Sequence, residues 1–190
     1  MALWPGQLPQ AEYLHVGNER WARFHTLPES KEFADNSAET AEILHRHDAL
    51  LGVLAGEDTI ELYVATEKAS RSATVRPVQD LLANLLEWDF WLTAPHDQGS
   101  DEFPLWNHVY VAPVRPASIA LHELLLLVAE EKEGGVVIFD ASMQWLYQPY
   151  AGGSDVTART PAERDELAAT FWTWLPAPGF RASPAGTTEG

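Results

Sequence analysis

Two short segments contain the titratable side chains best suited to a polar site. Their members are Arg23, His25, Glu29, Lys31, Tyr150 and Asp155. If the segments met in one cleft, His25 would serve as acid or base and Asp155 would orient it. Arg23 or Lys31 would hold an anionic group. Nothing in the spacing requires the segments to meet, and the first could equally cap and bridge a turn before the next helix.

A glycine pair separates Tyr150 from Asp155. Gly152 and Gly153 supply the positive φ that this stretch needs without steric cost, and they would let a ligand approach the backbone. The structural alternative is a tight turn in which Asp155 accepts hydrogen bonds from nearby amides. The sequence leaves both interpretations open.

Other catalytic chemistries find no support. The chain has no cysteine, which excludes thiol nucleophiles and cysteine-ligated metal sites. His45 and His47 are two residues apart on a predicted helix, where side chains point in different directions, so they do not form a ligand pair. The basic cluster of Lys68, Arg71 and Arg76 has no glycine-rich phosphate loop, and no Gly-x-Ser-x-Gly elbow is present. We therefore assign no catalytic residue, no metal ligand and no cofactor.

Net charge is the most informative feature of the composition. The chain has a formal net charge of −16, and its acidic residues are spread along its length. Such a surface repels nucleic acid and anionic lipid, while a basic protein partner is electrostatically favoured. The simpler explanation of this negative charge is that it keeps the protein soluble. No signal peptide or membrane-length apolar run is visible, so a cytoplasmic location is expected.

A β-hairpin is the clearest structural pattern. Val136–Asp140 is apolar on both alternating faces, which is typical of a strand near the centre of a sheet. Asp140–Gln144 supplies a turn, and Trp145–Gln148 is the return strand, which Pro149 is expected to end.

The remaining pattern predicts further helices and strands on either side of this hairpin. The expected helices are Ser37–Leu54, Pro77–Leu86, Ile119–Glu133 with Ser118 as N-cap, and a helix from Pro161 to about Trp174 with Thr160 as N-cap. The expected strands are Thr59–Thr66, Trp88–Thr93, Trp106–Val111 and Val156–Ala158. We read residues 67–76 as a solvated loop. Strands and helices come in clusters along the chain and do not alternate strictly, which predicts one α+β domain over residues 1–175. We expect a mainly antiparallel sheet of five or six strands with three or four helices packed on it. Residues 1–19 are an irregular lead-in, and residues 176–190 are expected to form a flexible tail.

Two parts of the chain together resemble a known family. Residues 23–31 with the segment 42–47, and residues 145–155 with the segments 161–165 and 174–175, are similar to an uncharacterised family of bacterial proteins, a domain of unknown function. In that family the second motif reads Tyr-Asp-Gly-Gly-x-Asp, and Ala151 stands here in place of its first acid. If that acid has a catalytic or ligand-binding role in relatives, this chain has lost it, whereas a structural role would tolerate the change.

Two functional hypotheses follow. The first is a non-enzymatic protein-interaction domain, by analogy immunity-like, that binds a basic partner. The alternative is a small-ligand-binding protein or enzyme with a polar pocket around His25 and Asp155. Most tryptophans fall in predicted elements and should be buried, so an exposed one would mark a contact surface.

Overall fold

A computed structural model of the chain describes residues 18–78, 81–96 and 104–177. The strands are β1 (Trp21–His25), β2 (Leu62–Ser70), β3 (Asp89–Pro95), β4 (Trp106–Val114), β5 (Val136–Phe139), β6 (Leu146–Tyr150) and β7 (Gly153–Thr157). The helices are α1 (Ser37–Ala55), α2 (Ile119–Ala129) and α3 (Pro161–Thr170). Short 3-10 turns occur at Pro28–Ser30, Leu81–Asn84 and Trp172–Trp174.

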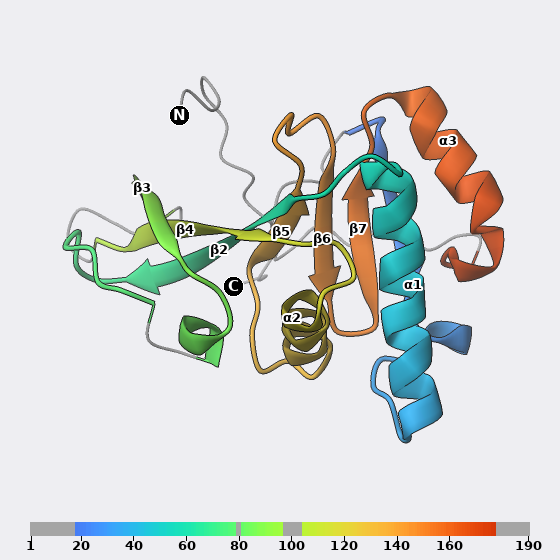
Figure 1. Cartoon of the computed structure of the whole chain (residues 1–190), viewed down its shortest axis with the longest axis horizontal. Coiled ribbons are helices and arrows are strands. Elements are labelled where there is room, and N and C mark those ends of the chain that lie inside the picture. The colour runs from blue at the N-terminus through green and yellow to red at the C-terminus, as the bar shows by residue number, and fades with distance from the viewer. Residues whose placement is uncertain (1–17, 79–80, 97–103, 178–190) are drawn as a thin grey trace, which may run out of the picture.

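The seven strands of the described part form one antiparallel sheet in the order β1-β7-β6-β5-β2-β4-β3. The sheet is strongly twisted, so that β2 and β4 run roughly horizontally in Figure 1 while β6 and β7 run roughly vertically. The predicted α+β class is confirmed, but the sheet has seven strands instead of five or six. The strand that we did not predict is β1, which pairs only with β7, far along the chain.

The three helices bury their apolar sides against one face of the sheet, where they form the main core (Figure 1). At its centre, Phe24, Ile138, Tyr147 and Val156 come from the strands and Trp145 directly precedes β6; all five are fully buried. Alternation along each strand places these residues on a single face.

The other face carries a smaller apolar cluster. Its buried members are Ala65, Val109, Val137, Phe139, Met143 and Leu146, with Tyr63, Trp91, Leu92 and Val111 partly buried beside them. All of them come from strands or from the β5–β6 turn. Within the described ranges, no helix contributes to this cluster.

Helix capping follows the sequence signals. Asn36 precedes α1 and its side chain accepts hydrogen bonds from the amides of Ala38 and Glu39. Ser118 caps α2, and Thr160 caps α3 with a bond from the Glu163 amide, as predicted. Each cap satisfies amides that the first helical turn leaves without a partner.

One predicted helix and part of one predicted loop are wrong. The segment Pro77–Leu86 contains no α-helix in its described residues, but only a 3-10 turn closed by the Leu85 amide on the Leu82 carbonyl. Strand β2 continues to Ser70, through residues expected to form a loop, because Glu67 to Ser70 pair with β4. For Pro77–Leu86, the apolar spacing is too short to distinguish an α-helix from a single 3-10 turn with one buried leucine, Leu82.

Prolines end strands less strictly than expected. Pro149 lies inside β6 and pairs with Ser154, while β5 reaches β6 only at Ile138 and Tyr147. Pro113 likewise lies inside β4, beyond the last residue that β3 pairs. Each proline therefore lies at a position that pairs with one neighbouring strand only, where a missing N–H is tolerated.

The predicted lead-in and tail fall almost entirely outside the described residues. Among the helices that the structure describes, none is long and apolar enough to cross a membrane.

Candidate functional site

Strands β1 and β7 bring Arg23 and Asp155 together. The two residues are direct partners in the register of this pair, so their side chains leave the sheet on the same face. Arg23 Nε donates to Asp155 Oδ1 at 2.7 Å, and Arg23 Nη2 donates to Oδ2 at 2.8 Å. Only 6% of the Asp155 side chain and 19% of that of Arg23 are exposed. This is a bidentate, largely desolvated ion pair.

Two aromatic rings enclose this ion pair. The Arg23 guanidinium lies 5.4 Å from the centre of the Trp21 ring and 5.2 Å from that of Tyr150, which is cation–π geometry. The hydrogen bond to Asp155 raises the pKa of Arg23. Burial, and next the charge of Asp155, raise the pKa of Tyr150 well above its usual value. The phenol is therefore neutral at physiological pH, and the guanidinium is charged.

Gly153 makes room for this arrangement. A Cβ at position 153 would lie 2.6 Å from the Phe24 carbonyl oxygen and 2.7 Å from the Tyr150 hydroxyl. The neighbouring Gly152 has φ of 82°, which favours glycine. Strand packing therefore explains Gly153 and the positive φ explains Gly152, so only one of the two glycines has the positive φ predicted for the pair. Asp155 belongs to β7 and bonds to Arg23, so it does not cap a turn as the structural alternative supposed.

His25 shares this face but does not contact Asp155. It is paired in register with Gly153, two residues away from Asp155, and its Nε2 lies 3.1 Å from the Ser30 hydroxyl. Burial is the main cause that lowers the pKa of His25, and the charges of Arg23 and Arg46 act in the same direction. The imidazole is therefore mainly neutral at pH 7, and both oxygens of its proposed orienter are already bonded to Arg23.

The other two predicted site residues serve the entry into α1 or face solvent. Lys31 Nζ donates to Asp35 at 2.8 Å and to both oxygens of Glu39 at 2.7 and 2.6 Å. Glu29 is exposed and has φ of 57° in the 3-10 turn. The structure thus brings Arg23, Tyr150 and Asp155 together. Lys31 instead bridges Asp35 and Glu39 before and within the first turn of α1, as the alternative interpretation of its segment supposed.

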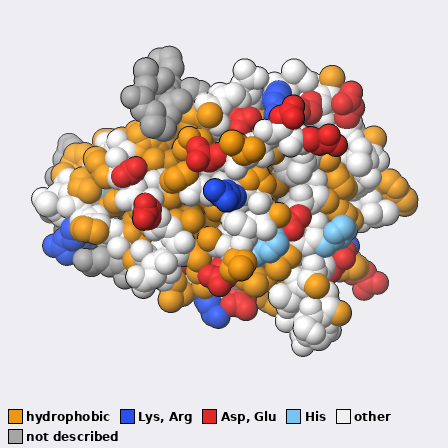
Figure 2. Space-filling model, in the orientation of Figure 1, with side chains coloured by type: hydrophobic (Ala, Val, Ile, Leu, Met, Phe, Trp, Pro, Cys, Tyr) orange, Lys and Arg blue, Asp and Glu red, His pale blue; other side chains and the backbone are white. Residues whose placement is uncertain are grey.

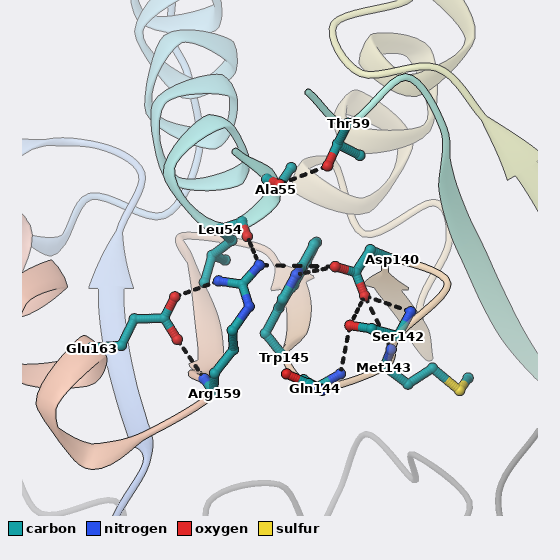
Figure 3. Close-up of polar contacts among 10 residues, drawn as sticks. All are labelled: Leu54, Ala55, Thr59, Asp140, Ser142, Met143, Gln144, Trp145, Arg159 and Glu163. Atoms are coloured by element: carbon teal, nitrogen blue, oxygen red, sulfur yellow. Dashed lines mark hydrogen bonds and ion pairs between the residues drawn. The ribbon is translucent and has the colours of Figure 1, made fainter. Parts of the chain in front are cut away.

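A second polar network ties three elements together (Figure 3). Asp140 accepts from the amides of Ser142 and Met143, at 2.9 and 3.0 Å, and from Trp145 Nε1 at 2.9 Å. Arg159 donates to the Leu54 carbonyl at the end of α1 and to Glu163 in α3. The side chains of Asp140 and Arg159 find their partners inside this network, so we assign it a structural role. The bonds from the Ser142 and Met143 amides to Asp140 confirm the predicted turn after Asp140.

Helix α1 contains a buried histidine. His47 is 1% exposed, and its Nδ1 lies 2.5 Å from the Tyr147 hydroxyl. Burial lowers the pKa of His47 to about 3, and burial also raises the pKa of Tyr147. A protonated phenol therefore donates to a neutral imidazole. His45 is exposed, and no cluster of three metal-ligating side chains occurs among the residues that the structure places.

Sequence reasoning missed an apolar pocket on the second face of the sheet. Its volume is about 620 Å³, and ten residues line it: Glu61, Tyr63, Asp89, Phe90, Trp91, Val111, Pro113, Phe139, Ala141 and Met143. Strand register accounts for the grouping, because Tyr63 on β2 lies opposite both Phe139 on β5 and Pro113 on β4. The pairing of β5, β2, β4 and β3 was needed to show that this face forms a pocket.

Glu61 and Asp89 are the titratable groups at the edge of this pocket, apart from Tyr63. Both carboxylates are exposed, and the Tyr63 hydroxyl donates to Glu61 Oε1 at 2.7 Å. That hydrogen bond is the main cause that raises the pKa of Tyr63, so the phenol remains a donor. No Lys, Arg or His is found among the described residues that line the pocket. The site is an apolar depression with a negative rim, which is suited to binding an apolar group.

The described residues thus form an α+β fold with a seven-stranded antiparallel sheet, a largely buried bidentate ion pair and an aromatic pocket. Residues 10–177 match the family model described as "Domain of unknown function (DUF3885)", so the chain belongs to this family. Comparison with curated proteins and with solved structures gave no match. The expected membership of a family of unknown function is therefore confirmed at that level.

Proposed function

We propose that this domain is a non-enzymatic binding protein that recognises a basic protein partner through the aromatic pocket on the second face of its sheet. The observation that carries the proposal is the pocket itself: an apolar interior whose edge presents Glu61 and Asp89 and no cation among its described lining residues. An interior of this kind binds an apolar group, and its rim selects positively charged neighbours.

The charge of the whole chain supports the same partner. A net charge of −16 raises the rate of encounter with a basic protein and disfavours acidic ones. Figure 2 shows carboxylates scattered over the visible face, with hydrophobic side chains between them. The long-range field thus attracts a basic protein, while the pocket provides the place where it is bound.

Affinity capture from an extract of the native host, at low salt and with a matched high-salt wash, tests this proposal. We expect a basic protein that is retained in about 0.1 M salt and lost near 1 M, where the screening length falls from about 10 Å to about 3 Å. The variant Glu61→Gln/Asp89→Asn should retain less of it. The control Glu123→Gln/Glu166→Gln removes two exposed carboxylates from α2 and α3, so both variants have a net charge of −14 instead of −16.

Retention of no protein at low salt would count against the proposal. So would a partner that both double variants retain equally well, because binding would then depend on total charge and not on the rim.

A second candidate function is ligand binding or catalysis around His25 and Asp155. One observation favours it: Gln148 Oε1 is buried beside Asp155 in strand register and has no hydrogen-bond partner among the described residues. However, the Asp155 carboxylate accepts from Arg23 at both oxygens and does not orient His25. A thermal-shift ligand screen on wild type and on His25→Ala tests it, and a ligand that stabilises only the wild type would support this candidate over the first.

A further inference from the structure

The interior of the pocket consists of aromatic rings in mutual contact. The rings of Tyr63 and Phe139 are stacked, with centroids 6.1 Å apart and an interplanar angle of 16°. The ring of Trp91 lies 6.2 Å from that of Phe139 at 42°. The buried side chain of Met143 adds a polarisable thioether. Aromatic faces carry negative electrostatic potential, so this surface attracts another aromatic ring and also an organic cation.

A β-bulge in strand β3 places Trp91 on this surface. Phe90 pairs with Tyr110 and Leu92 pairs with Val109, so Trp91 is the extra residue between them. Trp91 and Leu92 consequently pack in the same apolar cluster, although consecutive residues of a regular strand face opposite sides. The bulge therefore brings a large aromatic ring to the side of the sheet where Phe139 and Tyr63 lie.

One hydrogen bond joins the rim to the interior of the pocket. Tyr63 is both a wall of the pocket and the donor that holds Glu61, so one residue links the aromatic interior to the charged edge. Asp89 is the first residue of β3 and pairs with Val111, which lies on the pocket floor. A volume of about 620 Å³ is within the range of about 300–1,000 Å³ that is usual for ligand pockets. The space exceeds what one lysine stem would fill.

We propose that the pocket receives an aromatic residue of the partner that is flanked by lysine or arginine, with the ring against Trp91 and Phe139 and the cations at Glu61 and Asp89. This inference rests on the proposed function and adds the recognition chemistry to it. The aromatic ring supplies contact area, and the flanking cations supply selectivity against acidic and neutral segments.

Short peptides with blocked ends provide the test. The probe is acetyl-Gly-Lys-Trp-Lys-Gly-amide, and the comparison peptides replace both lysines by glutamate, or the tryptophan by alanine. Binding is followed by NMR through the indole N–H signal of Trp91, which is assigned by its loss in Trp91→Phe. We expect the Lys-Trp-Lys peptide to shift this signal in a saturable way, the glutamate peptide to leave it unchanged, and the alanine peptide to bind at least tenfold more weakly.

Variants of the chain complete the test. Trp91→Ala should weaken binding of the Lys-Trp-Lys peptide at least tenfold, measured by calorimetry. Glu61→Gln/Asp89→Asn changes only exposed groups and should weaken it about threefold to tenfold, while Glu123→Gln/Glu166→Gln should leave it within twofold. Tyr63→Phe keeps the ring and removes the bond to Glu61, so its effect should be smaller than that of the double variant.

Equal binding of the lysine and glutamate peptides, or saturable binding that Trp91→Ala does not change, would overturn the inference. Absence of any peptide binding would overturn it as well. The proposed function fails separately, if affinity capture retains no basic protein. A captured basic protein that binds wild type and Trp91→Ala equally would place the contact elsewhere and leave the interaction role standing.

Discussion

Asp155 accepts both hydrogen bonds of the Arg23 guanidinium, at 2.7 and 2.8 Å, across the register of β1 and β7. The pair joins β1, at one edge of the sheet, to β7. It also engages both oxygens of Asp155, the residue that the sequence analysis assigned to a polar site with His25. Its geometry is that of a structural ion pair, and this assignment can be tested by stability measurements.

Asp155→Asn should destabilise the fold by about 2 to 3 kcal/mol, because it leaves the Arg23 charge partly buried without its counterion. The measurement is the free energy of unfolding in urea. The control is Asp165→Asn, which removes an exposed partner of Arg164 and should change stability by less than about 0.5 kcal/mol. If the two substitutions had equally small effects, Asp155 would not be structural and its assignment to a ligand site would regain support.

Gly153→Ala should destabilise the fold by at least about 2 kcal/mol, since its Cβ would meet the Phe24 carbonyl and the Tyr150 hydroxyl. Gly52→Ala provides the matched comparison, because this position lies within α1 and has nothing within 4 Å of an added Cβ. The helical position should gain about 0.5 to 1 kcal/mol from lower backbone entropy in the unfolded chain. Thermal and urea unfolding of both variants should therefore shift in opposite directions.

How much the sequence predicts depends on whether a feature is local. The caps Ser118 and Thr160 and the turn at Asp140 were predicted, because each uses residues within a few positions. Strand β1 was missed although Ala22 and Phe24 alternate with polar neighbours, a signal that was available. The aromatic and polar residues around it obscured a five-residue strand.

The site could be predicted only in part for the same reason. Arg23 and Asp155 were both named, but as parts of one site with His25, and only the β1–β7 register shows that they bond to each other. The pocket depends on the adjacency of β5, β2, β4 and β3 and on the bulge at Trp91. No local spacing encodes these long-range pairings. Arg46 is a further example, because its burial against the His25 carbonyl and Trp174 was not anticipated.

Acid should destabilise the protein through His47. Its pKa of about 3 in the folded chain lies below the ordinary value of 6.5, so the unfolded chain binds the proton more tightly. The stability from this group is fully present above pH 6.5 and is lost progressively as the pH falls towards 3. Between pH 7 and pH 5 the expected loss is about 2 kcal/mol, a window in which most carboxylates remain ionised.

His47→Gln isolates this contribution in urea unfolding measured at pH 7, 6 and 5. It should reduce the slope of stability against pH, whereas His45→Gln, at the exposed neighbouring position, should not. His25, whose pKa is also lowered, contributes to the slope that remains. An unchanged slope in His47→Gln would show that this histidine is not held neutral by burial.

The most direct test of the interaction role is the dissociation constant of the captured partner for three chains: wild type, Trp91→Ala and Trp172→Ala. Trp172 is 70% exposed and lies beyond α3, so it is the tryptophan that the sequence-based prediction would take as a contact surface, and Trp172→Ala tests that alternative. We predict that Trp91→Ala weakens binding at least tenfold and that Trp172→Ala changes it less than twofold. Full binding by Trp91→Ala together with loss of binding by Trp172→Ala would contradict the account and move the contact surface to the end of α3.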